Sequence, residues 1–278
     1  METSGNGVTC GDMKRAEIVS QIHQKKSVLC VGLDTDLTKI PSHLLQEEDP
    51  VFAFNKAIID ATQEFAVSYK INTAFYEAQG LKGWQSLERT LAYIPRNIFT
   101  IADAKRGDIG NTSTQYAKTF FETYEFDSVT IAPYMGKDSV APFLEFRDKW
   151  GIVLGITSNE GSLDFQHLLV DGRPLYEHVL ERVASWGTPE NIMFVVGATR
   201  KEQLAHVRSL CPDHFFLIPG VGAQGGDVDT VCRNTLNSDA GVLINVSRGV
   251  IYAGNDEHFA EAAAAAARQY QKEMSVYL

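Results

Sequence analysis

The segment Asn97-Ile-Phe-Thr-Ile-Ala-Asp-Ala-Lys105 is an apolar run that ends in charged side chains. A parallel strand covered by helices on both faces is apolar on both of its faces, so its sequence is a nearly continuous apolar run. Asp103 and Lys105 then fall at the carboxyl end of that strand. The segment therefore predicts a buried parallel strand that carries polar groups at its end.

Seven further segments show the same apolar run between turn residues. They are residues 27–34, 66–72, 127–134, 150–158, 191–199, 215–222 and 241–249. Amphipathic stretches lie between them, at residues 51–65, 77–94, 112–124, 175–186, 201–210 and 228–236. The alanine-rich segment 258–278 closes the chain with a strong helix-forming composition. Eight strands alternating with helices predict an α/β fold, a single (β/α)8 barrel of the TIM type.

The expected domain organisation is a flexible leader over residues 1–13 and one barrel domain over residues 14–278. No stretch rich in proline, glycine and serine divides the chain. A doubly wound sheet also alternates strands with helices, but eight strands whose polar residues gather at the carboxyl ends favour the barrel. In a barrel, active sites lie at that end.

Composition limits the classes of partner. With 25 Lys and Arg against 35 Asp and Glu, the formal net charge is −10, which argues against a general binder of nucleic acid or of anionic membranes. No apolar run approaches the about 20 residues that a membrane span needs. The four cysteines lie far apart without zinc-site spacing, so we expect reduced cysteines in a cytoplasmic protein.

Charged residues near the ends of two neighbouring strands suggest a catalytic array. Side chains alternate along a strand, so Asp103 and Lys105 point the same way, and Asp108 lies within about 10 Å of Lys105. Lys70 ends the preceding strand. Neighbouring carboxylates repel one another unless ammonium groups lie between them, so we expect alternating charges. The alternative for the DxKxxD motif by itself is an ordinary strand-end ion pair with a helix-capping aspartate.

The glycine-rich segment Pro219-Gly-Val-Gly-Ala-Gln-Gly-Gly-Asp227 follows the seventh strand. Its Gly-x-Gly-x-x-Gly spacing matches the dinucleotide fingerprint, but the acidic residue that should end the next strand is missing. In a barrel, the loops after the last two strands commonly bind phosphate. Arg248 and Gly249 after the eighth strand, with Gln224, are therefore expected at a phosphate site. The alternatives are a surface arginine that caps the strand and a solvated glutamine.

The sequence lacks the motifs of other catalytic classes. The seven histidines show no metal-ligand spacing, and no Gly-x-Ser-x-Gly elbow is present. No metal and no organic cofactor is expected, and Ser158 is expected to form hydrogen bonds at a strand end rather than to act as a nucleophile.

Taken together, these motifs resemble the orotidine 5'-phosphate decarboxylase family, and the chain length and residues 157–159 resemble its longer, type 2 bacterial branch. The resemblance rests on residues 31–34, 69–72, 103–112, 219–224 and 248–249. It implies decarboxylation of orotidine 5'-phosphate to UMP and CO2, the last step of de novo pyrimidine nucleotide synthesis, by a cofactor-independent homodimer. It assigns no role to the leader or to residues 159–174.

The same resemblance implies roles for individual residues. Lys105 would be the proton donor to C6, and Lys70, Asp103 and Asp108 would complete the charged tetrad, with Asp108 supplied by the partner subunit. The implied substrate-binding residues are Asp34, Asn72, Ile109, Thr112, Ser158, Pro219, Gln224, Arg248 and Gly249. Of these, Asp34 would contact the ribose together with Lys70, Ser158 the pyrimidine, and the last three the phosphate.

Three other functions agree with parts of the sequence. A magnesium-dependent sugar-phosphate lyase of the same superfamily can carry DxKxxD, but it would need the metal to hold an enediolate. A non-catalytic nucleotide-binding barrel would not be expected to keep all four charged residues intact. A nicotinamide-dependent oxidoreductase is disfavoured by the missing acidic residue.

Overall fold

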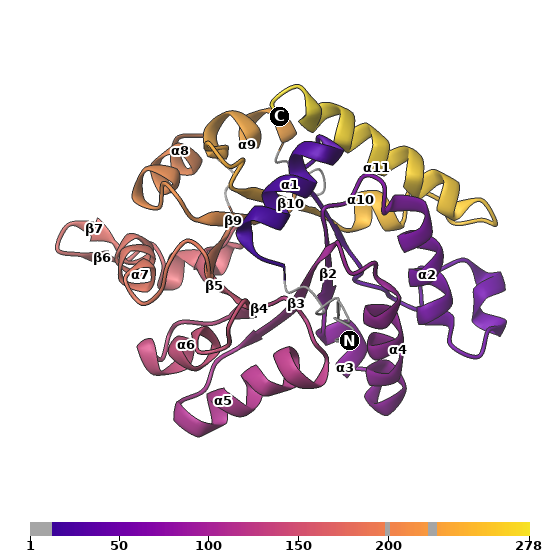
Figure 1. Cartoon of the computed structure of the whole chain (residues 1–278), viewed down its shortest axis with the longest axis horizontal. Helices are drawn as coiled ribbons and strands as arrows, with labels where there is room; N and C mark the ends of the chain where they lie inside the picture. The colour runs from indigo at the N-terminus through magenta and orange to yellow at the C-terminus, as the bar shows by residue number, and fades with distance from the viewer. Residues whose placement is uncertain (1–12, 198–200, 222–226) are drawn as a thin grey trace, which may run out of the picture.

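The computed structural model describes residues 13–197, 201–221 and 227–278, and in them eight parallel strands close into a barrel (Figure 1). The barrel strands are β1 Leu29–Gly32, β2 Ser68–Asn72, β3 Phe99–Arg106, β4 Ser128–Ile131, β5 Trp150–Ile156, β8 Ile192–Val196, β9 Phe215–Pro219 and β10 Val242–Val246. Around the barrel they follow the order β1-β10-β9-β8-β5-β4-β3-β2. Each strand coincides with one predicted segment, which confirms the predicted (β/α)8 barrel.

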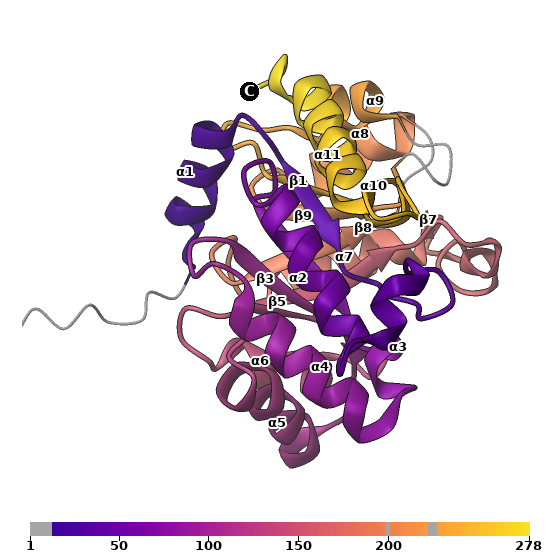
Figure 2. The ribbon, with the colours of Figure 1, turned by 90° about the vertical axis from the view of Figure 1, so that its right-hand side faces the viewer.

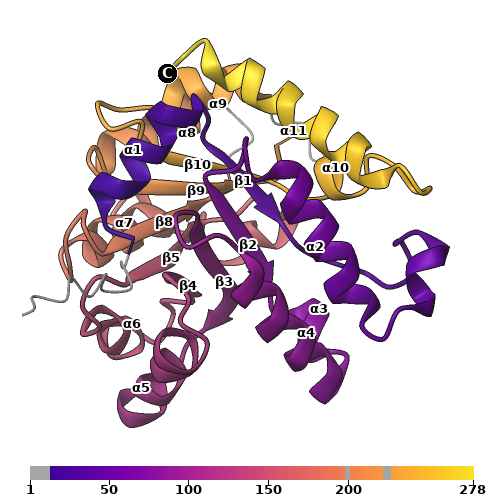
Figure 3. The ribbon, with the colours of Figure 1, turned by 45° about the vertical axis from the view of Figure 1, so that its right-hand side comes forward.

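Helices surround the barrel, and α11 packs along α2, α9 and α10 (Figure 3). The helices are α1 Arg15–Lys25, α2 Pro50–Thr62, α3 Ala74–Glu77, α4 Gly80–Tyr93, α5 Gly110–Lys118, α6 Lys137–Leu144, α7 Leu175–Ala184, α8 Lys201–Leu210, α9 Val228–Thr235, α10 Arg248–Ile251 and α11 Phe259–Ser275. Caps explain two of the starts, because Asp49 accepts from the N–H of Phe52 and Asp227 from that of Thr230.

The sequence does not predict α1, α6 and α10, nor the short α3, which lies before the stretch predicted from residue 77. Helix α6 has eight residues with Pro142 inside it, and α10 has only four, so neither shows a long apolar period. In the described part of the chain, no helix is long and apolar enough to cross a membrane.

A short antiparallel hairpin forms within residues 159–174, between β5 and α7. Its strands are β6 Leu169–Val170 and β7 Arg173–Pro174, and it projects from the edge of the molecule beside α7 (Figure 1). Arg173 pairs with Glu177 of α7 at 2.9 Å, and a ring nitrogen of His178 lies 2.9 Å from the carbonyl of Val170. These contacts fasten the hairpin to α7.

Helix α1 covers the amino-terminal end of the barrel, opposite the hairpin (Figure 2). Its Arg15 is buried and donates to Asp239 and to the carbonyls of Pro189 and Asp213. These three partners precede β10, β8 and β9, so one side chain ties α1 to three loops. Met13, the last residue of the predicted leader, is buried, and its carbonyl accepts from the indole of Trp150. Residues 1–12 lie outside the described residues.

Candidate active site

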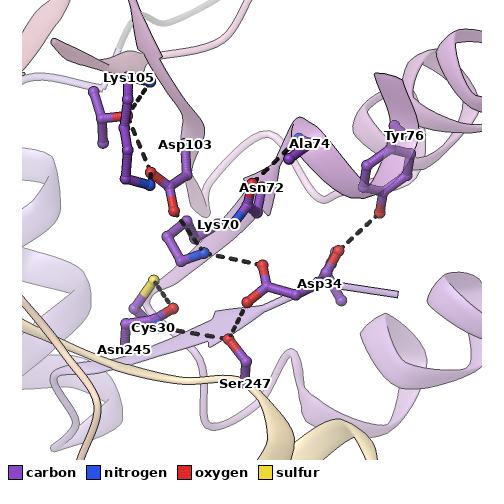
Figure 4. A network of polar contacts seen from close by, with 12 residues as sticks. Cys30, Asp34, Lys70, Asn72, Ala74, Tyr76, Asp103, Lys105, Asn245 and Ser247 are labelled. Atoms are coloured by element: carbon purple, nitrogen blue, oxygen red, sulfur yellow. Dashed lines mark hydrogen bonds and ion pairs between the residues drawn. The ribbon is translucent and has the colours of Figure 1, made fainter. Parts of the chain in front are cut away.

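Four charged side chains form an alternating chain where β1, β2 and β3 end (Figure 4). Lys70 Nζ lies 3.0 Å from Asp34 Oδ1 and 3.1 Å from Asp103 Oδ2. Lys105 Nζ lies 2.6 Å from Asp103 Oδ1. The order is therefore Asp34, Lys70, Asp103, Lys105, with no like charges next to each other, and we call these four residues the charged array.

The two inner members of the array, Lys70 and Asp103, are shielded from water, and Lys105 at one end is exposed to it. The side chains of Lys70 and Asp103 are 5% and 11% exposed, whereas that of Lys105 is 50% exposed. Burial lowers the pKa of Lys70, but the charges of Asp34 and Asp103 outweigh burial and raise it above its ordinary value. Burial raises the pKa of Asp103, but Lys70 and Lys105 outweigh burial and lower it to about 2. Lys70 is therefore an ammonium and Asp103 a carboxylate at neutral pH.

Strand register brings the array together. In the parallel pairing, Lys70 of β2 lies beside Gly32 of β1, and Asn72 of β2 lies beside Asp103 of β3. Because parallel strands end on the same side of the barrel, the polar residues that end β1, β2 and β3 meet there.

The backbone at Lys105 departs from a regular strand. Lys105 has φ +47°, in the left-handed region that residues other than glycine seldom adopt. The pairing of β3 with β4 also shifts between Ala102 and Arg106. The predicted approach of Asp103 and Lys105 is present, but it arises in a β-bulge and not from the plain alternation of a strand.

Asp34 also contacts residues other than Lys70, and the sequence assigns no role to these residues. Ser247 Oγ donates to Asp34 Oδ2 at 2.7 Å, and Asn245 Nδ2 lies 3.4 Å from Ser247 Oγ. The hydroxyl of Tyr252 donates to the carbonyl of Asp34 at 3.2 Å. A serine directly before Arg248, at the end of an apolar strand, is the signal that could have identified Ser247.

A cavity of about 240 Å³ lies beside the charged array. Its lining includes Asp34, Lys70, Asn72, Asp103, Pro219, Gly220, Asn245, Ser247, Arg248, Gly249 and Tyr252. Residues predicted for ribose, for catalysis and for phosphate thus share one cavity, although they come from distant parts of the sequence. A larger cavity of about 430 Å³, lined by Glu88, Pro95 and Asp127 among others, contains none of the predicted site residues.

Several predicted residues do not line this cavity, and Lys105, at the exposed end of the charged array, is one of them. Asp108 Oδ1 accepts from the N–H of Ile109 at 2.8 Å, and within the described residues Asp108 does not join the charged array. Ile109 is 56% exposed, and Thr112 is exposed on α5. Ser158 is exposed after β5 and is not part of the cavity lining. Gln224 lies outside the described residues.

The array differs in one member from the four residues that the sequence groups together. Within one chain, the two carboxylates of the array are Asp103 and Asp34, whereas the sequence groups Asp103 and Asp108 with the two lysines.

Among the described residues, no three or more His, Cys, Asp and Glu side chains are grouped as metal ligands would be.

Comparison with known proteins finds relatives over nearly the whole chain. The family described as orotidine 5'-phosphate decarboxylase / HUMPS matches residues 27–263. An orotidine 5'-phosphate decarboxylase of Flavobacterium johnsoniae is 57% identical over 266 residues, which are 95% of this chain and 97% of the relative. One of Bacteroides fragilis is 53% identical over 271 residues, 96% of this chain and 98% of the relative. The structure of Leishmania donovani OMP decarboxylase matches with a TM-score of 0.82 at 36% identity, covering 95% of this chain and 98% of that one.

Proposed function

This chain belongs to the orotidine 5'-phosphate decarboxylase family, and we propose that it converts orotidine 5'-phosphate to UMP and CO2, the last step of de novo pyrimidine nucleotide synthesis. The observation that carries the proposal is the charged array, three of whose members, Asp34, Lys70 and Asp103, line one cavity together with Arg248 and Gly249. An array of this kind is a poor stabilising device because its desolvation is costly, which favours a catalytic use.

The reaction needs stabilisation of a carbanion. When the bond from C6 to the carboxylate breaks, CO2 leaves and the electron pair stays on C6, in the ring plane, where the π system cannot delocalise it. The ammonium of Lys105 supplies a positive charge for that carbanion and then donates a proton to C6. Lys105 regains its proton from solvent, to which its side chain is half exposed. The carboxylate of Asp103 holds the ammonium of Lys105 in place with one oxygen, while its other oxygen binds Lys70.

The remaining residues would hold the nucleotide away from the reacting carbon. Arg248, the backbone of Gly249 and Gln224 would bind the 5'-phosphate, with Pro219 at the start of the glycine-rich loop. Asp34 and Lys70 would bind the ribose hydroxyls, Asn72 would line the same region, and Ser158 would contact the pyrimidine. Binding energy from the remote phosphate would then serve to position the ring over Lys105.

The proposal includes a homodimer in which each subunit completes the other's site with Asp108, Ile109 and Thr112. Two features support it. The carboxylate of Asp108 accepts from the N–H of Ile109 and does not join the array in its own chain, and the loops after β3 and β4 carry exposed apolar side chains, with Ile109 at 56%, Tyr134 at 87% and Met135 at 49%. Burial of Cys30, Cys211 and Cys232 as thiols supports the cytoplasm as the location.

Subunit mixing tests the dimer. The variants Lys105→Ala and Asp108→Ala are each expected to be nearly inactive, whereas their equimolar mixture, unfolded and refolded together, is expected to recover about one quarter of wild-type activity. Half of the dimers are then mixed, and each mixed dimer has one intact site. A mixture as inactive as its components would contradict the shared site.

The assay for the reaction is the fall in ultraviolet absorbance when the chain is added to orotidine 5'-phosphate, with and without EDTA. We expect turnover in both conditions, and no turnover with Lys105→Ala. An unchanged absorbance with folded wild-type protein would overturn the proposed function, and activity that EDTA abolishes would favour the metal-dependent alternative.

A further inference from the structure

Thr130, in the middle of β4, lies opposite the bulge that carries the catalytic lysine. The strand partners on either side are Ala102 with Val129 and Arg106 with Ile131. Three residues of β3 therefore face the single residue Thr130 of β4. Thr130 is completely buried, and its hydroxyl and that of Ser128 are the two polar side-chain groups of β4.

The hydroxyl of Thr130 joins the backbone of the bulge to the charged array. Its oxygen accepts from the N–H of Lys105 at 2.8 Å, and its hydrogen is donated to Asp103 Oδ1 at 3.1 Å. A hydroxyl can do both because it has one donor and two acceptor lone pairs. The bulged N–H, which has no strand partner, is thereby satisfied.

This placement fixes two orientations at once. Asp103 Oδ1 receives both the Thr130 hydroxyl and Lys105 Nζ, so Oδ2 is turned toward Lys70. The left-handed backbone of Lys105 is an unfavourable conformation that persists only where neighbouring groups hold it. The hydrogen bond from the N–H of Lys105 to Thr130 is such a restraint.

We propose that Thr130 is a positioning residue for decarboxylation, which sets the backbone of Lys105 and the carboxylate plane of Asp103 so that the ammonium meets C6. The inference rests on the proposed function of the same site. Thr130 touches no reacting atom and acts through Lys105 and Asp103. Its loss should therefore slow the chemical step and leave nucleotide binding, which Arg248 and Gly249 would provide, nearly unchanged.

The test compares Thr130→Val, which keeps the shape and removes the hydroxyl, with Thr130→Ser, which keeps the hydroxyl. Steady-state kinetics with orotidine 5'-phosphate and the affinity for UMP are measured for both. For Thr130→Val we expect kcat to fall by about 10-fold to 100-fold, with KM and UMP affinity within about threefold of wild type. For Thr130→Ser we expect kcat within about threefold of wild type.

Thr100 offers a matched control at the other end of the same pair of strands. Its hydroxyl also accepts a backbone N–H and donates to a carboxylate, in this case both from Asp127, at 2.9 Å and 2.7 Å. Thr100→Val should lose stability in urea to a similar extent as Thr130→Val, with kcat unchanged. This contrast separates a positioning role from a general loss of packing.

The outcomes are distinct. A wild-type chain that does not decarboxylate the nucleotide contradicts the proposed function itself. With an active wild type, the inference is overturned by a Thr130→Val variant with full kcat, by a Thr130→Ser variant as slow as the valine variant, or by an equal loss of kcat in Thr100→Val. If Thr130→Val does not fold, Thr130→Ala takes its place against Thr130→Ser under the same criteria.

Discussion

Gly32 and Ser247 lie so close together that a Cβ at position 32 would stand 1.9 Å from Ser247 Oγ. The same hydroxyl donates to Asp34 Oδ2 at 2.7 Å, and Asp34 is the first member of the charged array. Because Gly32 of β1 has no side chain, the Ser247 hydroxyl has the space that it needs to bind Asp34.

The substitution Gly32→Ala is expected to displace the Ser247 side chain. We expect a loss of about 1–3 kcal/mol in the free energy of unfolding, as for other overpacked sites, and a fall in kcat/KM because Asp34 loses its hydrogen bond. Urea denaturation and kinetics measure the two effects. In the double variant Gly32→Ala with Ser247→Gly, stability should largely return while kcat/KM stays low. Strictly additive changes in stability would show that the two residues do not compete for space.

Lys105 and Arg248 should separate chemistry from binding. Lys105→Ala is expected to abolish decarboxylation, because Lys105 supplies the positive charge and the proton at C6. UMP should still bind, because other residues hold its phosphate and ribose. Arg248→Ala is expected chiefly to raise KM, by about 10-fold to 100-fold for a lost charged hydrogen bond to phosphate. Kinetics and UMP titration distinguish the two variants. An Arg248→Ala variant with an unchanged KM would remove Arg248 from the phosphate site.

His214 should make the fold sensitive to mild acid. It is 7% exposed, and neither ring nitrogen has a hydrogen-bond partner among the described residues. Burial, with Arg15 and Arg208 nearby, lowers the pKa of His214 from 6.5 to about 4. Between these two values the unfolded chain binds the proton and the folded chain does not, so the stability is present above pH 6.5 and is lost as the pH falls toward 4.

From this shift we expect a loss of about 2 kcal/mol in the free energy of unfolding between about pH 7 and pH 5. Urea denaturation at the two pH values measures it, and His214→Leu should remove most of the difference. A leucine variant as sensitive to acid as the wild type would assign the effect to other groups.

Arg15 should stabilise the barrel without contributing to catalysis. Its guanidinium bonds Asp239 Oδ2 at 2.9 Å and two backbone carbonyls, at the end of the barrel opposite the charged array. Arg15→Ala is expected to cost about 2–4 kcal/mol of stability, because it leaves these acceptors without their donor, with kcat unchanged. Lys14→Ala is the control, since Lys14 is half exposed and makes one long ion pair of 3.8 Å. Equal stability of the two variants would contradict the role of Arg15.

The composition of the array shows where local pattern stops being informative. Period-two alternation brings Asp103 toward Lys105, and the ion pair exists, yet a bulge with a left-handed lysine forms it. Neither the bulge nor Thr130 has a local signature, because a bulge is a mismatch between two paired strands and not a property of one. Asp34 joins the array because β1 pairs with β2, and closure of the barrel, which pairs β1 with β10, brings Ser247 to Asp34.

The sequence by itself determined the eight strands and the end of the barrel at which function would lie. Strands covered on both faces must be apolar, so Lys70, Asp103 and Arg248 were expected toward the carboxyl ends of their strands. Only the tertiary structure decided which of these groups touch. Contacts of about 3 Å depend on the register between strands, and register is set by packing across the whole barrel. That is why the contacts by which Ser247 and Thr130 orient the two carboxylates of the array appear only in the folded chain.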